Sequence, residues 1–181
     1  MLLTVGHGTL DQAALGAILS GAGVRRLVDV RRAPGSRRHP HVARAALEEW
    51  VPALGLAYQW EPRLGGWRKA GAGSPNTALR NDSFRGYADY MRTPPFWEAL
   101  DAVLAGAERE CSAVMCSEAV YWRCHRRLIS DAVVLARRGA VSHIGHDGRV
   151  TPHRLTDGVR KDGGLLVYDG GAAPMWEAQD S

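Results

Sequence analysis

The segment from Cys116 to Arg126, CSEAVYWRCHR, brings two cysteines, a glutamate, a histidine and an arginine close together in the chain. If Cys124 and His125 begin a helix, the unpaired amides and partial positive charge of its first turn would bind an anion and lower the pKa of the thiol. Arg126 would strengthen that field. The segment therefore predicts a reactive Cys124 thiolate or an anion held beside it, with Glu118 as a general acid or base.

The same residues allow other kinds of site. A Cys-x5-Arg phosphatase loop does not fit, because Trp122 occupies the place of the arginine. Cys116 and Cys124, with one of the histidines, could hold a divalent metal that keeps an open position, although their spacing is not the paired spacing of a structural zinc site. A nucleophilic pair of Cys124 with His7 or His143 is a further alternative, since such partners need only be close in space.

Polar residues also follow other predicted strands. Apolar runs predict strands at residues 2–6, 25–32, 111–118 and 140–145. These strands end at His7, at Asp29 and Arg31, at Cys116 and Glu118, and at His143, respectively. Parallel α/β sheets bind ligands outside the carboxyl ends of their strands, so we expect these groups to form one rim.

Asp29 and Arg31 flank Val30 and therefore share one side of their strand. A structural salt bridge and a ligand clamp both fit this arrangement.

Hydrophobic periodicity predicts the rest of an α/β fold: a mostly parallel sheet of about five strands with flanking helices. Helices are expected at 9–23, 42–54, 83–93, 94–110 and 124–139, a further strand at 55–60, and an additional strand at 163–171. Thr9 and Gln12 fit a capping box for the first helix, and the first two strands with this helix form a predicted βαβ unit. Residues 1–175 are expected to form one domain, and residues 176–181 a loose tail.

Composition excludes several classes of protein. The 181 residues contain only three cysteines and no apolar run near the roughly 20 residues that cross a bilayer, so we expect a cytoplasmic protein without membrane span or signal peptide. The net charge of +4 fits a nucleic-acid footprint, a phosphate-bearing ligand or the arginine-rich coding preference of a GC-rich genome. The arginine pairs are scattered, so charge alone does not select nucleic acid.

The glycine-rich segment 61–82 is a long predicted loop, and it includes RLGGW at 63–67. Aromatic residues there and elsewhere could form a wall for a base or sugar ring, or could be core packing under the loop. They are Tyr58, Trp60, Trp67, Tyr87, Tyr90 and Trp122.

The motifs TVGHGT, LVDVRRAPGSRR, LGG, FRGYADYM, MCSEAVYWRCHR and VSHI, in this order, resemble the domain-of-unknown-function 488 (DUF488) family of small bacterial and archaeal proteins. The resemblance covers residues 3 to about 144, and Cys-x-Glu-x5-Cys-His-Arg is its most specific part. The sequence departs from the family pattern at GHGT, because many relatives have serine after the histidine. Thr9, one place later, would have to supply that hydroxyl. The resemblance implies functional positions at His7, Asp29, Arg31, Pro34, Ser36, Leu64, Gly65, Gly66, Tyr87, Cys116, Glu118, Cys124, His125, Arg126 and His143.

The family has no established activity, so the resemblance names no reaction. Our hypothesis is an enzyme that binds an anionic, nucleotide-like or nucleic-acid-derived ligand, with Cys124, Glu118 and His7 as catalytic groups. The expected ligand contacts are Asp29, Arg31, Ser36, Gly65, Gly66, Tyr87, His125, Arg126 and His143. The alternatives are a non-catalytic nucleic-acid-binding module and a metal-binding protein that uses Cys116, Cys124 and a histidine.

Overall fold

The computed structural model describes residues 1–171, which form an α/β fold around a six-stranded sheet of order β3-β2-β4-β1-β5-β6. Five strands are parallel: β1 (Leu2–Gly6), β2 (Arg26–Asp29), β3 (Ala57–Trp60), β4 (Ser112–Cys116) and β5 (Val141–Ile144). The short strand β6 (Val150–Pro152) pairs antiparallel with β5. The predicted mostly parallel sheet is confirmed, but β4 lies between β1 and β2, so the first two strands are not neighbours.

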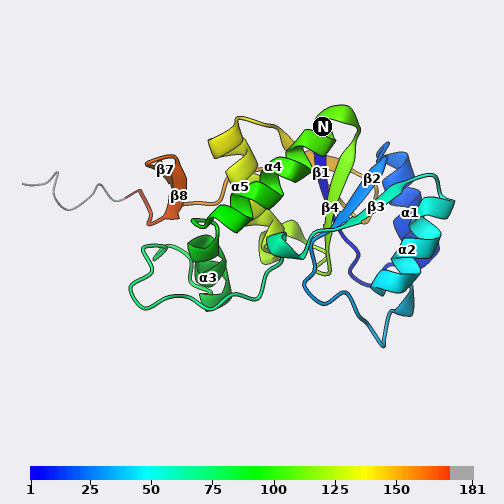
Figure 1. Ribbon diagram of the computed structural model, residues 1–181, viewed down its shortest axis with the longest axis horizontal. Coiled ribbons are helices and arrows are strands. Elements are labelled where there is room, and N and C mark those ends of the chain that lie inside the picture. Colours follow the sequence, from blue (N-terminus) through cyan, green and yellow to red (C-terminus); the bar gives the residue numbers. More distant parts are fainter. Residues whose placement is uncertain (172–181) are drawn as a thin grey trace, which may run out of the picture.

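Helices cover both faces of the sheet (Figure 1). On one face lie α1 (Gln12–Gly21) and α2 (Arg44–Ala53), and on the other α3 (Asp82–Tyr90), α4 (Pro94–Arg109) and α5 (Arg126–Arg137). Successive residues of a strand point to opposite faces. In β4, therefore, Ala113 and Met115 pack in the core beneath α1 and α2, while Val114 packs in the core with α4 and α5.

The helix and strand ends differ from expectation in three places. The cap of α1 is Asp11, whose carboxylate accepts a hydrogen bond from the Ala14 amide at 2.8 Å, so the predicted Thr9 capping box is wrong. Strand β2 ends at Asp29, because the Asp29 carboxylate bonds the Arg31 amide and turns the chain. Helix α5 spans Arg126–Arg137, shorter than the expected 124–139, and Arg138 after it has a left-handed backbone.

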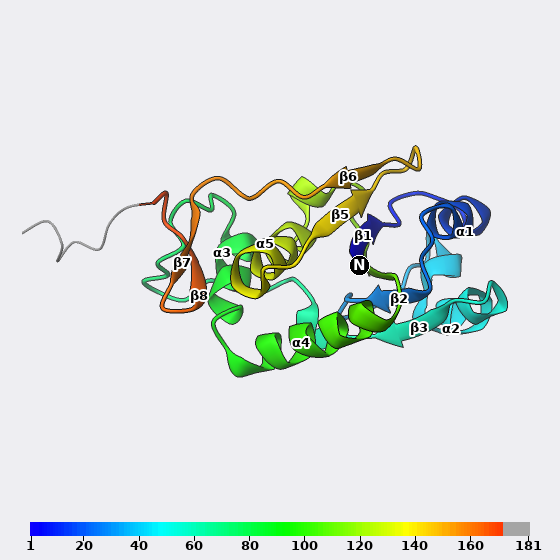
Figure 2. The ribbon, with the colours of Figure 1, turned by 90° about the horizontal axis from the view of Figure 1, so that it is seen from above.

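A two-stranded sheet of β7 (Val159–Asp162) and β8 (Leu165–Tyr168) packs against α3 and α5 (Figure 2). The strand predicted at 163–171 is therefore present but belongs to this separate hairpin, and the sequence patterns missed β7 and β6. Single 3-10 turns stand at Pro40–Val42, Pro62–Leu64 and Tyr121–Arg123.

The boundary predicted at residue 175 and the tail at 176–181 lie outside the described residues. Within residues 1–171, no helix combines the length and apolar character needed to cross a bilayer.

Candidate functional site

Two cysteines and a histidine meet where β4 ends and α5 begins. Cys116 is the last residue of β4, and Cys124 and His125 directly precede α5. His125 Nδ1 lies 3.7 Å from Cys124 Sγ and 3.9 Å from Cys116 Sγ. The three atoms lie within 4.8 Å of one another, and together with Arg126 we call these residues the thiol cluster.

Arg126 is the charged member of the thiol cluster, and it is 1% exposed. Its Nε donates to Cys124 Sγ at 3.4 Å, and one Nη donates to the Thr4 hydroxyl at 3.3 Å. The other Nη donates to the backbone carbonyls of Glu118 and Ala119. Among residues 1–171, no carboxylate forms an ion pair with this guanidinium.

Glycines allow the close packing of the thiol cluster. A Cβ on Gly6 would overlap the Glu118 carbonyl and lie 2.6 Å from an Arg126 nitrogen. A Cβ on Gly66 would lie 2.8 Å from His125 Nδ1. Both backbones therefore approach closer than a side chain would allow, which is a common reason for glycine in such places.

Electrostatics separate the two thiols. The pKa of Cys124 is held well below its usual range by a hydrogen bond from Cys116, with further contributions from His125 and the Arg126 charge, against the effect of burial. The pKa of Cys116 is raised well above its usual range by its hydrogen bond to Cys124 and by burial. These opposite shifts favour the thiolate at Cys124 and the thiol at Cys116, and the Arg126 cation lies beside Cys124.

Tyr87 fixes the histidine of the thiol cluster. It is fully buried, its hydroxyl donates to the Leu64 carbonyl at 2.7 Å, and its ring centroid is 4.9 Å from that of His125. With Gly66 packed on the imidazole, the Nδ1 edge faces the sulfurs. His125 Nε2 is buried and has no hydrogen-bond partner in the part of the chain that the structure covers.

A chain of hydrogen bonds, which we call the Asp131 relay, leads from Arg126 into the core. Thr4 Oγ1 lies 2.6 Å from His143 Nδ1, His143 Nε2 lies 2.9 Å from His153 Nδ1, and His153 Nε2 lies 2.9 Å from an Asp131 carboxylate oxygen. In the tautomer that carries the His143 proton on Nε2, His143 donates to His153 Nδ1, His153 Nε2–H donates to Asp131, and the Thr4 hydroxyl donates to His143 Nδ1. The Thr4 oxygen then has a lone pair free to accept from Arg126.

Burial and the neighbouring His153 lower the pKa of His143 to about 3, so this ring is neutral at pH 7. Tyr121 stacks on it with ring centroids 3.5 Å apart and an interplanar angle of 9°. The Asp131 carboxylate also accepts from the Tyr168 hydroxyl and the Thr156 amide. Ring stacking therefore holds His143 in place, and hydrogen bonds hold Asp131 in place.

A second buried set of polar groups, the Asp29 cluster, comprises His7, Asp29, Arg31 and Tyr58. Arg31 donates from Nε and Nη2 to the two Asp29 oxygens at 2.8 and 2.7 Å, and the Tyr58 hydroxyl donates to Asp29 at 2.9 Å. His7 Nε2 accepts from Arg31 at 3.2 Å, and its Nδ1 donates to the Gly8 carbonyl. Burial, followed by the Arg31 charge, lowers the pKa of His7 to about 4.

The two clusters share one edge of the sheet but lie on different faces. His7, Asp29 and Arg31 continue the strand positions that face α1 and α2, whereas Thr4, Cys116 and His143 occupy the positions that face α4 and α5. The predicted strand ends thus gather at one edge, where the His7 backbone amide donates to the Cys116 carbonyl at 3.0 Å. The His7 side chain does not join the thiol cluster, because its ring nitrogens are engaged by Arg31 and by the Gly8 carbonyl.

Other predicted residues have separate places. The Glu118 side chain is exposed, and only its backbone carbonyl is bonded to Arg126. Ser36 Oγ accepts from the His39 amide in the 33–41 loop. Gly65 packs against the Val30 carbonyl at the end of β2.

Sequence reasoning missed Thr4, Tyr121, Asp131 and His153. Asp131 carried a signal, because it lies one turn after Leu128 on the apolar face of α5, where an acidic residue is rare unless it is paired. His153 follows a short edge strand, and nothing local marks it.

The chain was compared with known proteins. The family model "Domain of unknown function DUF488" matches residues 12–133, a range that holds the thiol cluster and Asp29 but not His7 or His143. Neither the curated proteins nor the solved structures contain a match.

Proposed function

The chain belongs to the DUF488 family, and we propose that it is an enzyme whose nucleophile is the Cys124 thiolate and whose ligand is anionic, nucleotide-like or derived from nucleic acid. The observation that carries this proposal is the environment of Arg126. A buried guanidinium without a counter-charge is costly, so a negative group is expected beside it. Among residues 1–171, Cys124 Sγ is the only atom bonded to this side chain that can become an anion.

The roles of the neighbours follow from their contacts. Cys124 attacks an electrophilic centre of the ligand and forms a bond to sulfur, while the leaving group departs with the pair of electrons from the broken bond. The Cys116 thiol, which remains protonated, supplies the proton that the leaving group takes up. Glu118 is exposed just beyond Cys116 and would contact the ligand from the solvent side.

The test is the pH profile of Cys124 alkylation by iodoacetamide, read by peptide mass spectrometry in reduced protein. Because Cys124 is only 4% exposed, the shape of the profile is informative and the absolute rate is not. We expect the rate to stay nearly constant well below pH 8, whereas the same cysteine in urea should follow an ordinary thiol pKa of about 8.5. A folded-state profile that matches the urea profile would exclude the thiolate.

A metal centre is the second candidate, favoured by the three donor atoms within 4.8 Å. Two sulfurs and an imidazole nitrogen are donors that zinc accepts, and they would leave one position open. The Arg126 cation competes for the same negative charge, which is why we place this candidate second.

Native mass spectrometry of protein purified without chelator separates the two candidates. A stoichiometric added mass of one metal ion, lost in Cys124→Ser, would establish the metal centre in place of the free thiolate. A bare polypeptide mass would support the thiolate. Three unpaired thiols also fit a cytoplasmic location, which we propose on that ground.

A further inference from the structure

The glycine-rich loop exposes one tryptophan beside the thiol cluster. Trp67 is 89% exposed, yet it directly follows Gly66, whose backbone packs on His125. Most other aromatic residues that could have formed a binding wall are used internally. Tyr87 is buried, Trp60 donates to the Arg31 carbonyl, and Tyr90 lies beneath Arg68. Trp67 therefore differs from them in facing solvent.

The backbone of Trp67 is both strained and held in place. Its φ of +61° lies in the left-handed region, which is unfavourable for a bulky residue. Arg32 donates to its carbonyl at 3.2 Å, and the preceding residues are fixed by the Tyr87 hydroxyl and by the close packing of Gly65 and Gly66. Backbone strain that the surroundings maintain is characteristic of ligand-binding positions.

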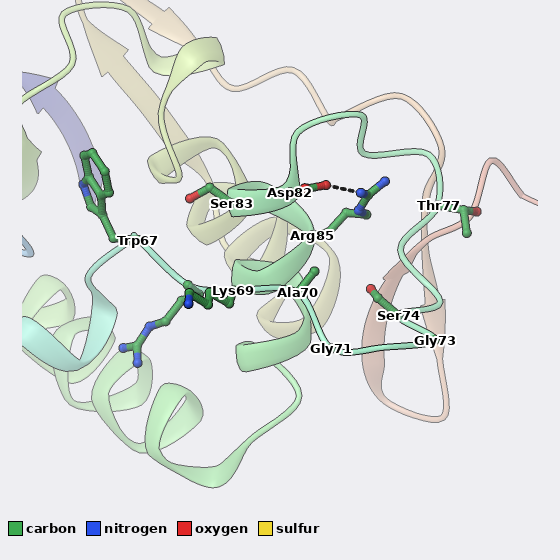
Figure 3. Close-up of a pocket in the computed structure, with 11 residues that line it drawn as sticks. Trp67, Lys69, Ala70, Gly71, Gly73, Ser74, Thr77, Asp82, Ser83 and Arg85 are labelled. Atoms are coloured by element: carbon green, nitrogen blue, oxygen red, sulfur yellow. Dashed lines mark hydrogen bonds and ion pairs between the residues drawn. The ribbon is translucent and has the colours of Figure 1, made fainter.

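Trp67 lines a cavity of about 750 Å³, a volume within the range of small-molecule sites. Figure 3 shows its lining along α3, with Trp67 at one end and Ser74 and Thr77 at the other. Arg68, Lys69 and Arg85 contribute positive charges, and the acidic side chain Asp82 is paired with Arg85. The cavity thus combines a flat ring with an excess of cations.

The glycine-rich wall of this cavity is anchored. Asp89 on α3 accepts from the Gly71 amide, the Ser74 hydroxyl and the Asn76 side chain, at 3.0, 2.7 and 2.8 Å. The loop also joins β8 through the Ala78 amide, which donates to the Tyr168 carbonyl. A ligand would therefore meet a formed surface.

We propose that this cavity binds a nucleotide unit, with the base stacked on Trp67 and the phosphate on Lys69 and Arg85. An exposed indole stacks with any base, and nearby cations bind the phosphate. This inference rests on the proposed function, whose substrate class it specifies, because Gly66 joins the stacking residue to the histidine beside Cys124.

Fluorescence polarisation tests the inference, with short labelled single-stranded DNA and RNA as probes and unlabelled nucleoside monophosphates as competitors. We expect Trp67→Leu to weaken binding by about 10-fold or more, and Trp67→Phe, which keeps a planar ring, to retain most of the affinity. Lys69→Ala should reduce the slope of the logarithm of affinity against the logarithm of salt concentration by about one.

Arg109→Ala is the matched control for lost positive charge. Arg109 ends α4 at the opposite edge of the sheet, where the N-terminal amine of Met1 donates to the Ala107 carbonyl. This variant should bind as the wild type does.

If monophosphates compete as strongly as oligonucleotides, the ligand of the cavity is a free nucleotide. If they compete much more weakly, the ligand is a nucleic-acid strand. Both outcomes support binding in the cavity. Absence of binding at low salt, or unchanged binding by Trp67→Leu, would overturn the inference.

Alkylation of Cys124 in Trp67→Leu keeps the two proposals separate, because we expect its pH profile to be unchanged. Binding that depends on Trp67 in a protein whose Cys124 titrates as an ordinary thiol would support the cavity and remove the proposed nucleophile. The non-catalytic binding module would then be the correct function.

Discussion

Two buried arginines lie at the same edge of the sheet and are neutralised in different ways. Arg31 is 7% exposed and forms two parallel bonds to the Asp29 carboxylate. Arg126 is 1% exposed and bonds a sulfur, a hydroxyl and two backbone carbonyls. The first has its counter-charge built in as a carboxylate, whereas the only bonded group that could supply a counter-charge to the second, among residues 1–171, is a thiol.

The difference indicates which cluster can act chemically. In the Asp29 cluster, every charge and both His7 nitrogens are engaged, which is typical of a structural ion pair. In the thiol cluster, the counter-charge would be the Cys124 thiolate, which is the nucleophile that we propose. On that proposal, the same residue type stabilises the fold on one face of the sheet and activates a thiol on the other.

The largest expected effect on stability comes from Arg31→Gln. This change leaves Asp29 buried without its cation, and we expect the free energy of unfolding to fall by about 3–5 kcal/mol in urea denaturation. The Cys124 alkylation profile should not change, because the Asp29 cluster lies on the other face. Arg31→Lys keeps the charge and serves as the control if the glutamine variant does not fold. A loss below about 1 kcal/mol would show that the pair is not structural.

Arg126→Gln should affect chemistry more than stability. Without the guanidinium, the pKa of Cys124 should rise, so that alkylation at pH 6 slows by about 10-fold or more. The neutralised thiol leaves no stranded carboxylate, so the loss of stability should be smaller than for Arg31→Gln. Equal alkylation rates in variant and wild type at pH 6 would contradict the role of Arg126.

Thr4 tests the Asp131 relay. Thr4→Val removes the hydroxyl between Arg126 and His143, and since bonds to charged groups contribute about 1.5–3 kcal/mol, we expect alkylation at pH 6 to slow by about 10-fold. Thr4→Ser should restore the rate. A purely structural role would lower the melting temperature of Thr4→Val without moving the pH profile.

A change of pH tests the two neutral histidines. The pKa values of His7 and His143 fall to about 4 and about 3 in the folded protein, whereas unfolded histidine titrates near 6.5. Below pH 6.5 the unfolded chain therefore binds protons that the native state does not, and stability declines as the pH falls toward those values. We expect a loss of about 2 kcal/mol per histidine between pH 7 and pH 5.

Urea midpoints measured at pH 7 and pH 5 check this loss. His7→Gln should reduce the pH dependence of the free energy of unfolding by about half, because the contribution of His143 remains. If His7→Gln leaves the pH dependence of stability unchanged, then His7 can take up a proton within the folded Asp29 cluster.

Much of the fold could be predicted from local pattern. Short apolar runs marked the five parallel strands, because buried strands need apolar residues on both faces. The edge strand β6 was missed because it is exposed, and strand β7 was missed because it is partly exposed and mostly charged, so neither has such a run. The order of strands was not predicted, because β4 inserts between β1 and β2 only through contacts far apart in sequence.

The site was predicted in part. The sequence placed Cys116, Cys124, His125 and Arg126 near one another, and the alternation of side chains along a strand could have assigned His7 and Asp29 to the other face. It could not show that Arg126 has no carboxylate partner among residues 1–171. It also could not show that the hydrogen bonds of the Asp131 relay run from Thr4 through His143 to His153. Those facts depend on segments more than one hundred residues apart, as the separation of 139 residues between Thr4 and His143 illustrates.

The sequence by itself therefore determined which residue types lie at the carboxyl ends of the strands, since strand periodicity and helix starts are local properties of the chain. Only the tertiary structure decided which of these groups share a face, which buried arginine has a carboxylate and which tryptophans face solvent. The physical reason is that burial and charge compensation depend on neighbours from distant segments, and these exist only after the sheet has assembled.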